Sequence, residues 1–201
     1  MIINDKIRHF EFYYEIIESL ELCSQKIIKI YESFDQNVEY KDDKSPFTRA
    51  DLVSHQHISA LLSSISNYPI ISEEGKKKYT NESKYWLVDP LDGTKEFLKK
   101  NGEFTINIAL IENNYPLQGF VYVPRDKTLF FGGLNKGSFK FRNNNITEIF
   151  AQSPNDKLKI VTSRSHLNET TKSYLSQFIN FDILQAGSSL KFCMIAEGLA
   201  D

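Results

Sequence analysis

The apolar residues follow three successive patterns along the 201-residue chain. In the first pattern, over residues 5–31 and again over residues 49–66, apolar side chains recur every three or four positions. This spacing predicts two amphipathic helices. Pro46 excludes helix at the residue before it, so Thr48 or Asp51 can open the second helix.

After the second helix the apolar period shortens to that of strands. The runs "YPIIS" and "YWLVD" are short and apolar, as in buried strands, and "FTINIALIE" alternates apolar with polar or small residues. The turn "ENNYP" leads into "LQGFVYVP", and "TLFFGG" and "SFKFR" continue as short strands. This middle part of the chain is therefore predicted to form an antiparallel sheet.

From Lys157 onward, strand and helix patterns alternate. "LKIVTS" and "FDILQA" indicate strands, while "NETTKSYLSQF" and "SSLKFCMIAEGLA" indicate helices. The whole order predicts a layered α/β (α+β) fold. We place the boundary between two halves at the "NDK" segment after Pro154, which divides the chain into residues 1–155 and 156–201.

Composition and charge exclude several classes of function. The formal net charge is -2, so no global field favours nucleic acid. No run approaches the roughly 20 apolar residues of a transmembrane segment, which makes a soluble cytoplasmic protein the default expectation. Cys23 and Cys193 lack the spacing of a metal knuckle or redox pair, and both are expected to be buried thiols in a reducing compartment.

The segment "YWLVDPLDGTKEF" is the strongest candidate for a reactive site. Asp89 is placed at the end of a strand and Asp92 in the following turn, at a sheet edge where α/β folds gather ligands. Gly93 permits close backbone approach, and Thr94 can cap a short helix with outward-facing amides. Carboxylates for a cation beside amides for an anion suit a phosphate ester held through a divalent metal, although a plain turn has the same residues.

A second pair of acids, Glu73 and Glu74, follows the preceding apolar run. Mg²⁺ prefers hard oxygen ligands, and Glu73, Asp89, Asp92 and the Leu91 carbonyl supply most of such a set. Glu74 is interpreted as a solvated loop acid. The scattered residues His9, His55 and His57 are interpreted as helix-packing or surface residues, and the lysines at 76–78 as a solvated loop.

These residues resemble the lithium-sensitive, magnesium-dependent phosphatases that include inositol monophosphatase and the 3'(2'),5'-bisphosphate nucleotidases. "DPLDGT" with an upstream "EE" is similar to the metal motif of that family. "SPFTRAD", "ISEE", "NGEFTINIALI", "SRSH" and "GSSLKFCMIAEG" look like the bacterial nucleotidase branch, in order from about Ser45 to Asp201. The resemblance implies a sugar-phosphatase-like αβαβα sandwich.

The resemblance also implies roles for individual residues. The implied metal ligands, for two or three Mg²⁺ ions, are Glu73, Asp89, the Leu91 carbonyl and Asp92. The implied catalytic residues are Asp51 and Thr94, which orient and deprotonate the attacking water, together with Glu73. The implied substrate contacts are Gly93, Thr94, His166, Ser188, Ser189 and Lys191, although Lys191 considered alone is more typical of a helix-surface lysine.

The function implied is hydrolysis of adenosine 3',5'-bisphosphate to AMP and phosphate by a metal-activated water. Two alternatives stay open: a phosphatase for inositol phosphate or another sugar phosphate, and a non-catalytic remnant that binds nucleotide or phosphate. The expected partner is thus a small nucleotide bisphosphate, with no nucleic acid and no transmembrane segment. A cytoplasmic location is implied, with association at the inner face of the membrane left open.

The chain departs from the family pattern at its end. A further metal aspartate, in a "WD-x-A-A-G"-like segment, would follow the residues that match "AEGLAD", and Asp201 does not take its place. We therefore expect a C-terminally incomplete second half with an exposed apolar face, and either a longer native protein or a homo-oligomer. We also expect this 201-residue form to have little or no nucleotidase activity.

Overall fold

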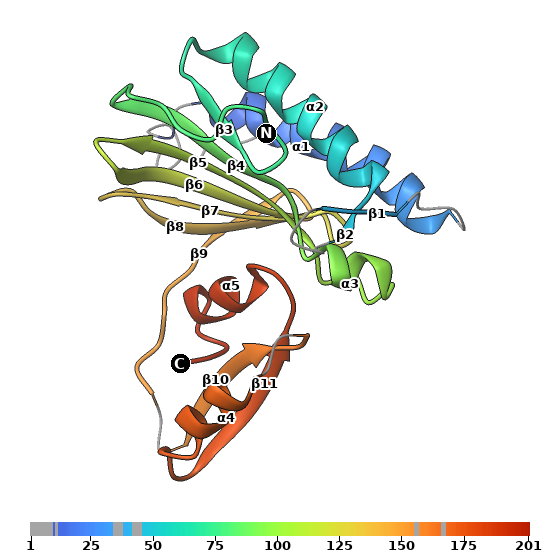
Figure 1. Cartoon of the computed structure of the whole chain (residues 1–201). Coiled ribbons are helices and arrows are strands. Elements are labelled where there is room, and N and C mark those ends of the chain that lie inside the picture. The colour runs from blue at the N-terminus through green and yellow to red at the C-terminus, as the bar shows by residue number, and fades with distance from the viewer. Residues whose placement is uncertain (1–9, 11, 34–37, 42–45, 155–156, 166–167) are drawn as a thin grey trace.

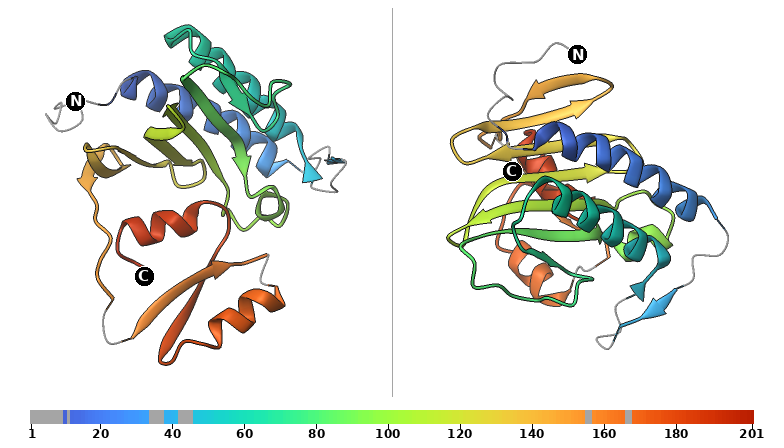
Figure 2. Two further views of the ribbon diagram at one scale, coloured as in Figure 1. Left: turned by 60° about the vertical axis from the view of Figure 1, so that its left-hand side comes forward. Right: turned by 90° about the horizontal axis from the view of Figure 1, so that it is seen from above.

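Two long helices cover one face of a large sheet. The computed structural model describes residues 10, 12–33, 38–41, 46–154, 157–165 and 168–201. The helices α1 (Tyr13–Glu32) and α2 (Arg49–Ile65) pack side by side over the sheet (Figures 1 and 2). Both helices predicted from the three-to-four spacing are confirmed.

The sheet has seven strands in the order β3-β4-β5-β6-β7-β8-β9. β3 is parallel to β4, and every later neighbour is antiparallel, as the middle of the sequence predicts. β1 (Glu39–Tyr40) and β2 (Pro46–Phe47) form a separate two-stranded ribbon. The strands of the large sheet are β3 (Ile70–Ser72), β4 (Lys84–Asp92), β5 (Thr105–Glu112), β6 (Tyr115–Val123), β7 (Thr128–Gly133), β8 (Gly137–Arg142) and β9 (Asn145–Glu148).

The main core lies between this sheet and the two helices. Alternate residues of β5, including Ile106, Ile108 and Leu110, are buried against apolar side chains of α1 and α2. Trp86 of β4 is fully buried, and its indole nitrogen donates to Ser66 Oγ at 2.9 Å. Each large apolar side chain buried in this way stabilises the fold by about 1.5–3 kcal/mol. The core therefore holds β4, which carries the candidate site, in a fixed position.

A smaller unit follows the large sheet. β10 (Leu158–Ser163) and β11 (Phe181–Ala186) pair in parallel, with the helices α4 (Glu169–Leu175) and α5 (Leu190–Ala196) beside them (Figures 1 and 2). The chain reaches this unit through an extended segment after β9. The predicted layered α/β class is confirmed. The division of the chain near residue 155 agrees with the separate sheet and stays a prediction.

Several element boundaries differ from the sequence-based expectation. The first helix begins at Tyr13, because Phe12 has a left-handed backbone (φ 60) and Phe10 lies in a bend; residues 5–9 lie outside the described residues. The helix predicted to begin at Ser188 begins at Leu190, and the helix of the "NETTKSYLSQF" segment ends at Leu175. The strand β9 has no counterpart among the predicted elements.

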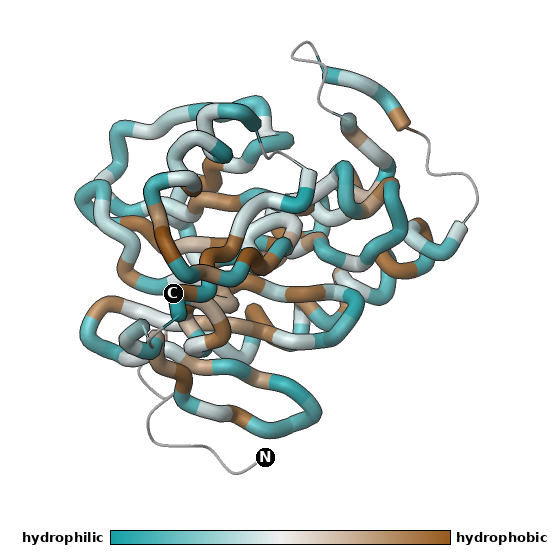
Figure 3. Tube along the Cα trace, turned by 90° about the horizontal axis from the view of Figure 1, so that it is seen from below, coloured by the Kyte–Doolittle hydropathy of each residue, from teal (hydrophilic) through white to brown (hydrophobic). Residues whose placement is uncertain are grey.

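Hydrophobic segments concentrate along the packed strands and helices, while the outer loops are more hydrophilic (Figure 3). Cys23 and Cys193 are buried free thiols, as expected. The smaller unit exposes apolar side chains of Phe192 and Ile179, with 72% and 91% of their surface accessible, and the expected exposed apolar face stays a prediction. No helix within the described residues is long and apolar enough to span a membrane.

Candidate active site

A bulge in β4 brings the two aspartates of "DPLDG" to the same face of the sheet. Asp89 pairs with Asn107 of β5 and Asp92 pairs with Thr105, with a register shift between the two pairs. β4 thus advances three residues while β5 advances two. Side chains three positions apart normally point to opposite faces of a strand, and one extra residue restores a common face. The strand continues to Asp92, so the prediction that Asp92 lies in a turn after the strand is wrong.

Asp89 and Asp92 form a group of partly buried acids with Glu73. Burial raises the pKa of the Asp89 carboxyl, and the negative charges of Glu73 and Asp92 raise it further. Burial also raises the pKa of Asp92, although the Ser189 amide and the Lys191 ammonium act in the opposite direction. Closely spaced carboxylates with raised pKa values bind either a proton or a cation, because either one reduces the repulsion between their negative charges. Their hard oxygen atoms fit a divalent ion such as Mg²⁺.

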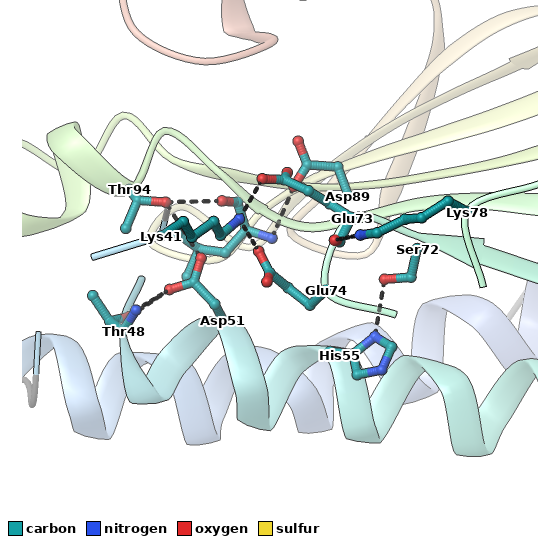
Figure 4. A network of polar contacts seen from close by, with 11 residues as sticks. Lys41, Thr48, Asp51, His55, Ser72, Glu73, Glu74, Lys78, Asp89 and Thr94 are labelled. Atoms are coloured by element: carbon teal, nitrogen blue, oxygen red, sulfur yellow. Dashed lines mark hydrogen bonds and ion pairs between the residues drawn. The ribbon is translucent and has the colours of Figure 1, made fainter. Parts of the chain in front are cut away.

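Asp51 and Thr94 form a hydrogen-bonded pair between α2 and the start of α3 (Thr94–Leu98). Asp51 closes a capping box, because its Oδ2 accepts from the Thr48 amide at 2.8 Å and from the Thr48 hydroxyl at 2.6 Å. Its other oxygen, Oδ1, accepts from Thr94 Oγ1 at 3.3 Å (Figure 4). Burial raises the pKa of Asp51, while the bonds from Thr48 lower it. The second helix is therefore opened by Thr48, and its first turn presents a fixed carboxylate to Thr94.

Thr94 itself is the first residue of α3, and Gly93 is the N-cap. The prediction that Thr94 caps this helix is therefore wrong. Its hydroxyl lies 3.3 Å from Asp51 and 3.4 Å from the Leu91 carbonyl. The hydroxyl is thus shared between one predicted proton acceptor and one predicted metal ligand.

Lys41 contacts both acids of the "SEE" segment. Its ammonium lies 2.6 Å from Glu73 Oε1 and 2.5 Å from Glu74 Oε1 (Figure 4). Burial disfavours the charge of Lys41, but its hydrogen bonds to Glu73 and Glu74 raise its pKa overall. The Glu74 side chain is only 11% exposed, whereas that of Glu73 is 52% exposed. The interpretation of Glu74 as a solvated loop acid is therefore wrong, because this carboxylate is paired and faces the site.

The "GSS" turn of the smaller unit packs against the β4–α3 connection. A Cβ atom at Gly93 would lie 3.1 Å from Ser188 Cβ and 2.9 Å from the Glu103 carbonyl, so glycine permits this close approach. Ser189 Oγ lies 2.8 Å from both Asn107 Oδ1 and Thr105 Oγ1, and the Ser189 amide bonds to Asp92. The turn is therefore held directly beside the acidic group.

One cavity of about 420 Å³ contains most of the predicted site residues. Lys191 lines it, and its ammonium donates to the Ser188 carbonyl at 2.5 Å. Asp89 lies in a neighbouring cavity that also contains Glu73, and Asp51 reaches the site through Thr94. The predicted residues that line the first cavity are Glu73, Asp92, Gly93, Thr94, Ser188, Ser189 and Lys191.

The two histidines that the structure describes, His55 and His57, do not line this cavity. His55 Nδ1 lies 2.9 Å from Ser72 Oγ, and His57 contacts Ser19 and Lys26, which agrees with their interpretation as packing residues. His9 and His166 lie outside the described residues, so the predicted substrate contact of His166 is not placed. The lysines at 76–78 are exposed, which agrees with their interpretation as a solvated loop, and Lys78 also donates to the Glu73 carbonyl.

Three contact residues were not found from the sequence: Lys41, Asn107 and Glu103. The alternation in "FTINIALIE" contains a signal for Asn107, because it places Thr105 and Asn107 on the face opposite the core. Lys41 and Glu103 have no such local signal. Their partners lie at least 32 positions away in the sequence.

Within the described part of the chain, no three Asp, Glu, His or Cys side chains are already arranged as a closed metal-ligand cluster. Glu73 is held by Lys41 and hydrogen-bonded to Asp89, so its carboxylate is shared between a cation and another acid. The donor types and charge fit a divalent ion. The assignment of Glu73, Asp89, Leu91 and Asp92 as metal ligands stays a prediction.

Comparison with known proteins identifies relatives along almost the whole chain. The profile of the Inositol monophosphatase family matches residues 11–201. A Buchnera aphidicola protein named 3'(2'),5'-bisphosphate nucleotidase CysQ is 46% identical over 182 residues, which cover 87% of this chain and 67% of the relative. The protein of the same name from Escherichia coli K12 is 40% identical over 179 residues, covering 87% of this chain and 72% of the relative.

Solved structures give the same result. CysQ from Bacteroides thetaiotaomicron, described as a bacterial member of the inositol monophosphatase family, superposes with a TM-score of 0.82 and 35% identity, over 96% of this chain and 79% of that structure. The Thermotoga maritima inositol monophosphatase superposes with a TM-score of 0.77 and 22% identity, over 96% and 75% of the two chains. The second likeness extends to the fold alone.

Proposed function

The chain belongs to the inositol monophosphatase family, and we propose that it is a divalent-metal-dependent phosphomonoesterase that converts adenosine 3',5'-bisphosphate to AMP and phosphate. The observation that carries this proposal is the bulge in β4. It gathers Asp89 and Asp92 on one face, next to the Gly93–Thr94 backbone and the Lys191 ammonium. The nucleotide is preferred to a sugar phosphate because relatives at 40–46% identity are named bisphosphate nucleotidases.

The proposed metal site contains two or three Mg²⁺ ions, held by Glu73, Asp89, Asp92 and the Leu91 carbonyl. Bound there, the ions would offset the charge of the phosphate dianion, lower the pKa of a water and stabilise the leaving oxygen. Among the described residues, the cations close to these acids are Lys41, Lys191 and Lys78, of which Lys78 donates to the Glu73 carbonyl. They are outnumbered by the acids Asp51, Glu73, Glu74, Asp89 and Asp92. This local excess of negative charge supports a requirement for divalent cations.

The Asp51–Thr94 pair would hold the attacking water in position. Asp51 Oδ1 accepts the Thr94 hydroxyl proton at 3.3 Å, which leaves the lone pairs of Thr94 Oγ1 free to accept from the water. The buried Thr48 contacts keep the Asp51 carboxylate in one orientation. Glu73, which lines the same cavity, would be a second acceptor for a water proton.

The substrate contacts follow from the remaining lining of the cavity. The Gly93 and Thr94 amides would bind the scissile phosphate, since backbone N–H groups at a glycine turn are suited to phosphate oxygens. Lys191, Ser188 and Ser189 would contact the nucleoside and its second phosphate. His166 is proposed as a further contact to the nucleoside and its second phosphate, and its segment lies outside the described residues.

Phosphate release from adenosine 3',5'-bisphosphate and from inositol 1-phosphate, compared at equal Mg²⁺, tests the proposal. We expect faster release from the nucleotide, loss of turnover with a chelator, and loss in Asp92→Asn. Faster release from the inositol ester would instead favour a sugar-phosphate monophosphatase. Calorimetric binding of the nucleotide without any hydrolysis would favour a non-catalytic binding module.

A further inference from the structure

A further cavity, of about 660 Å³, is separate from the two cavities of the candidate active site. It is formed by the C-terminal half of α1, the residue Lys100 after α3, and the turn between β6 and β7. It shares no described lining residue with the cavity that contains Asp92 and Lys191. Its described lining consists of Ser24, Gln25, Ile28, Lys29, Tyr31, Glu32, Lys100, Pro124, Arg125 and Lys127.

The charge of this lining is strongly positive. Lys29, Lys100, Arg125 and Lys127 come from three separate segments, and Glu32 is the one acid of the described lining. The chain as a whole has a formal net charge of -2, so the positive charge is local. Cations that converge on a concave surface raise the local concentration of anions.

Among the described residues, no acid forms an ion pair with these four cations. Asp126 lies in the same turn as Arg125 and Lys127, but its carboxylate oxygen Oδ2 forms an ion pair with Arg142 Nη2 at 3.9 Å. Across the described parts of the chain, neither Lys29 nor Lys127 has a carboxylate within ion-pair distance. Their charges are therefore available to an incoming anion.

Arg125 and Lys100 are placed by packing rather than by ion pairs. Gly102 has φ 82, and a Cβ atom there would lie 2.4 Å from Arg125 Cδ, so the arginine stem rests directly on the glycine. Lys100 Nζ lies 4.8 Å from the centroid of the Tyr31 ring and donates to the Ser33 carbonyl at 3.3 Å. A cation over an aromatic face keeps its charge while its stem is ordered. Both side chains are thus partly preorganised at the rim.

The floor of the cavity, formed by its buried lining residues, is mainly apolar. Pro124 and Tyr31 are buried, Ile28 is half-buried, and Ser24 is the one buried polar residue of the described lining. Apolar walls with a few converging charged groups are typical of small-molecule sites, in which the walls hold a ring or hydrocarbon part and the charges hold an anionic group. A floor of this kind distinguishes the cavity from a simple patch of solvated lysines.

We propose that this cavity is a second ligand site, which binds a small organic phosphate: a group with two or more negative charges joined to an apolar or ring-containing body. The charged part lies among Lys29, Arg125 and Lys127, and the body lies against Ile28 and Pro124. The site is independent of the proposed catalytic function, since its cations are not part of the catalytic cavity.

Calorimetric titration in the presence of a chelator and at low salt tests this site. Three probes are used. ADP presents both the charged part and the ring, inorganic pyrophosphate presents the charge alone, and adenosine presents the ring alone. We expect ADP to bind more tightly than either of the other two. The binding of ADP should also weaken as salt increases.

Two charge-reversed variants locate the binding. Lys29→Glu with Lys127→Glu should weaken ADP binding at least tenfold, because both side chains are exposed at this cavity. Lys76→Glu with Lys77→Glu changes the net charge equally, near Glu73 of the other site, and should change the affinity less than threefold. Lys29→Ala and Lys127→Ala, measured singly, should each weaken binding, which covers the case in which the double variant does not fold.

The proposal is overturned if both double variants weaken ADP binding equally, if Lys191→Ala abolishes it, or if ADP does not bind. Equal weakening would indicate a general charge effect. Loss in Lys191→Ala would place the ligand in the catalytic cavity. All three outcomes are measured as binding, so none of them depends on whether the protein hydrolyses a bisphosphate.

Discussion

Glu103 and Arg164 form a two-pronged ion pair that joins the large sheet to the smaller unit. Arg164 Nε lies 2.7 Å from Glu103 Oε2 and Arg164 Nη2 lies 2.7 Å from Oε1. The same carboxylate accepts from the Gly187 amide at 2.8 Å, and Arg164 also donates to the Gln185 carbonyl at 2.7 Å. The pair therefore fixes the start of the "GSS" turn, whose Ser189 amide bonds to Asp92.

Replacing Glu103 with Gln should loosen this turn without unfolding the large sheet. The hydrogen bond of Arg164 lowers the pKa of Glu103 despite its partial burial, so the carboxylate is charged and its loss weakens charge-assisted bonds. We expect a loss of about 1 kcal/mol in the free energy of unfolding, since the pair is partly exposed. Hydrogen exchange at Gly187 should become faster, which mass spectrometry or NMR can measure.

Lys172→Gln is the matched control for that variant, because it removes an ion pair to Glu169 that is exposed and local to α4. Its effect on exchange at Gly187 should be negligible. Unchanged exchange in Glu103→Gln would contradict a positioning role. If the proposed nucleotidase activity is present, the substrate KM should rise more than kcat falls.

Asp51→Asn should remove most of the proposed activity while the protein stays folded. The amide retains one oxygen, which can still accept from Thr48 in the capping box, but it is a far weaker base for the Thr94 hydroxyl. We expect kcat to fall by about 10²- to 10⁴-fold and the free energy of unfolding to change by about 1 kcal/mol. Steady-state kinetics and urea unfolding measure the two effects.

Thr94→Ser and Thr94→Val separate the hydroxyl from the rest of the side chain. Serine keeps the bond to Asp51 and should retain substantial activity, whereas valine should resemble Asp51→Asn. Equal activity of the serine and valine variants would show that the hydroxyl has no role in positioning the water.

Without divalent ions, the protein should become less stable as pH rises. The pKa values of Asp89 and Asp92 are raised in the folded protein, first by burial and then, for Asp89, by neighbouring acids. The folded state thus holds these protons more tightly than the unfolded chain does. The free energy of unfolding therefore falls as pH increases above about 4, the usual pKa of an aspartate.

Urea unfolding in the presence of a chelator, at pH 5.5 and pH 8, tests this dependence. Asp89→Asn should have a flatter pH dependence than the natural chain, because the asparagine does not ionise. Mg²⁺ should stabilise the natural chain more at pH 8 than at pH 5.5, since the ion competes with the proton for the same oxygens. A pH dependence identical in the natural chain and in Asp89→Asn would contradict the raised pKa of Asp89.

Local sequence patterns predicted those elements whose residues are close together in the sequence. The alternation in "FTINIALIE" is reproduced in β5, and "LKIVTS" and "FDILQA" are β10 and β11. The expectation failed where a backbone conformation interrupts a continuing pattern. Phe10 extends the apolar spacing of the first helix, but the left-handed Phe12 prevents the helix from including it.

The candidate site was only partly accessible to sequence reasoning for a similar reason. The acids at 73, 89 and 92 were visible as local motifs, yet the common face of Asp89 and Asp92 depends on a bulge between them, whose local signal is Pro90 inside a non-edge strand. The partners of Glu74 and Glu103, namely Lys41 and Arg164, lie 33 and 61 positions away. Such contacts come from the packing of separate elements, so a local pattern could not show that Glu74 is paired.

Lys41→Met should lower the Mg²⁺ concentration that half-saturates the protein. Lys41 bonds Glu73 at 2.6 Å, so its ammonium competes with a metal ion for that carboxylate. Methionine removes the charge and keeps most of the alkyl stem. Because the pair is partly exposed, we expect a change of about two- to fivefold, measured by the Mg²⁺ dependence of thermal unfolding. Lys77→Met, which removes an exposed charge from the loop after Glu74, is the control and should have little effect. A higher Mg²⁺ requirement in Lys41→Met alone would mean that the lysine orients Glu73 for the metal rather than competing with it.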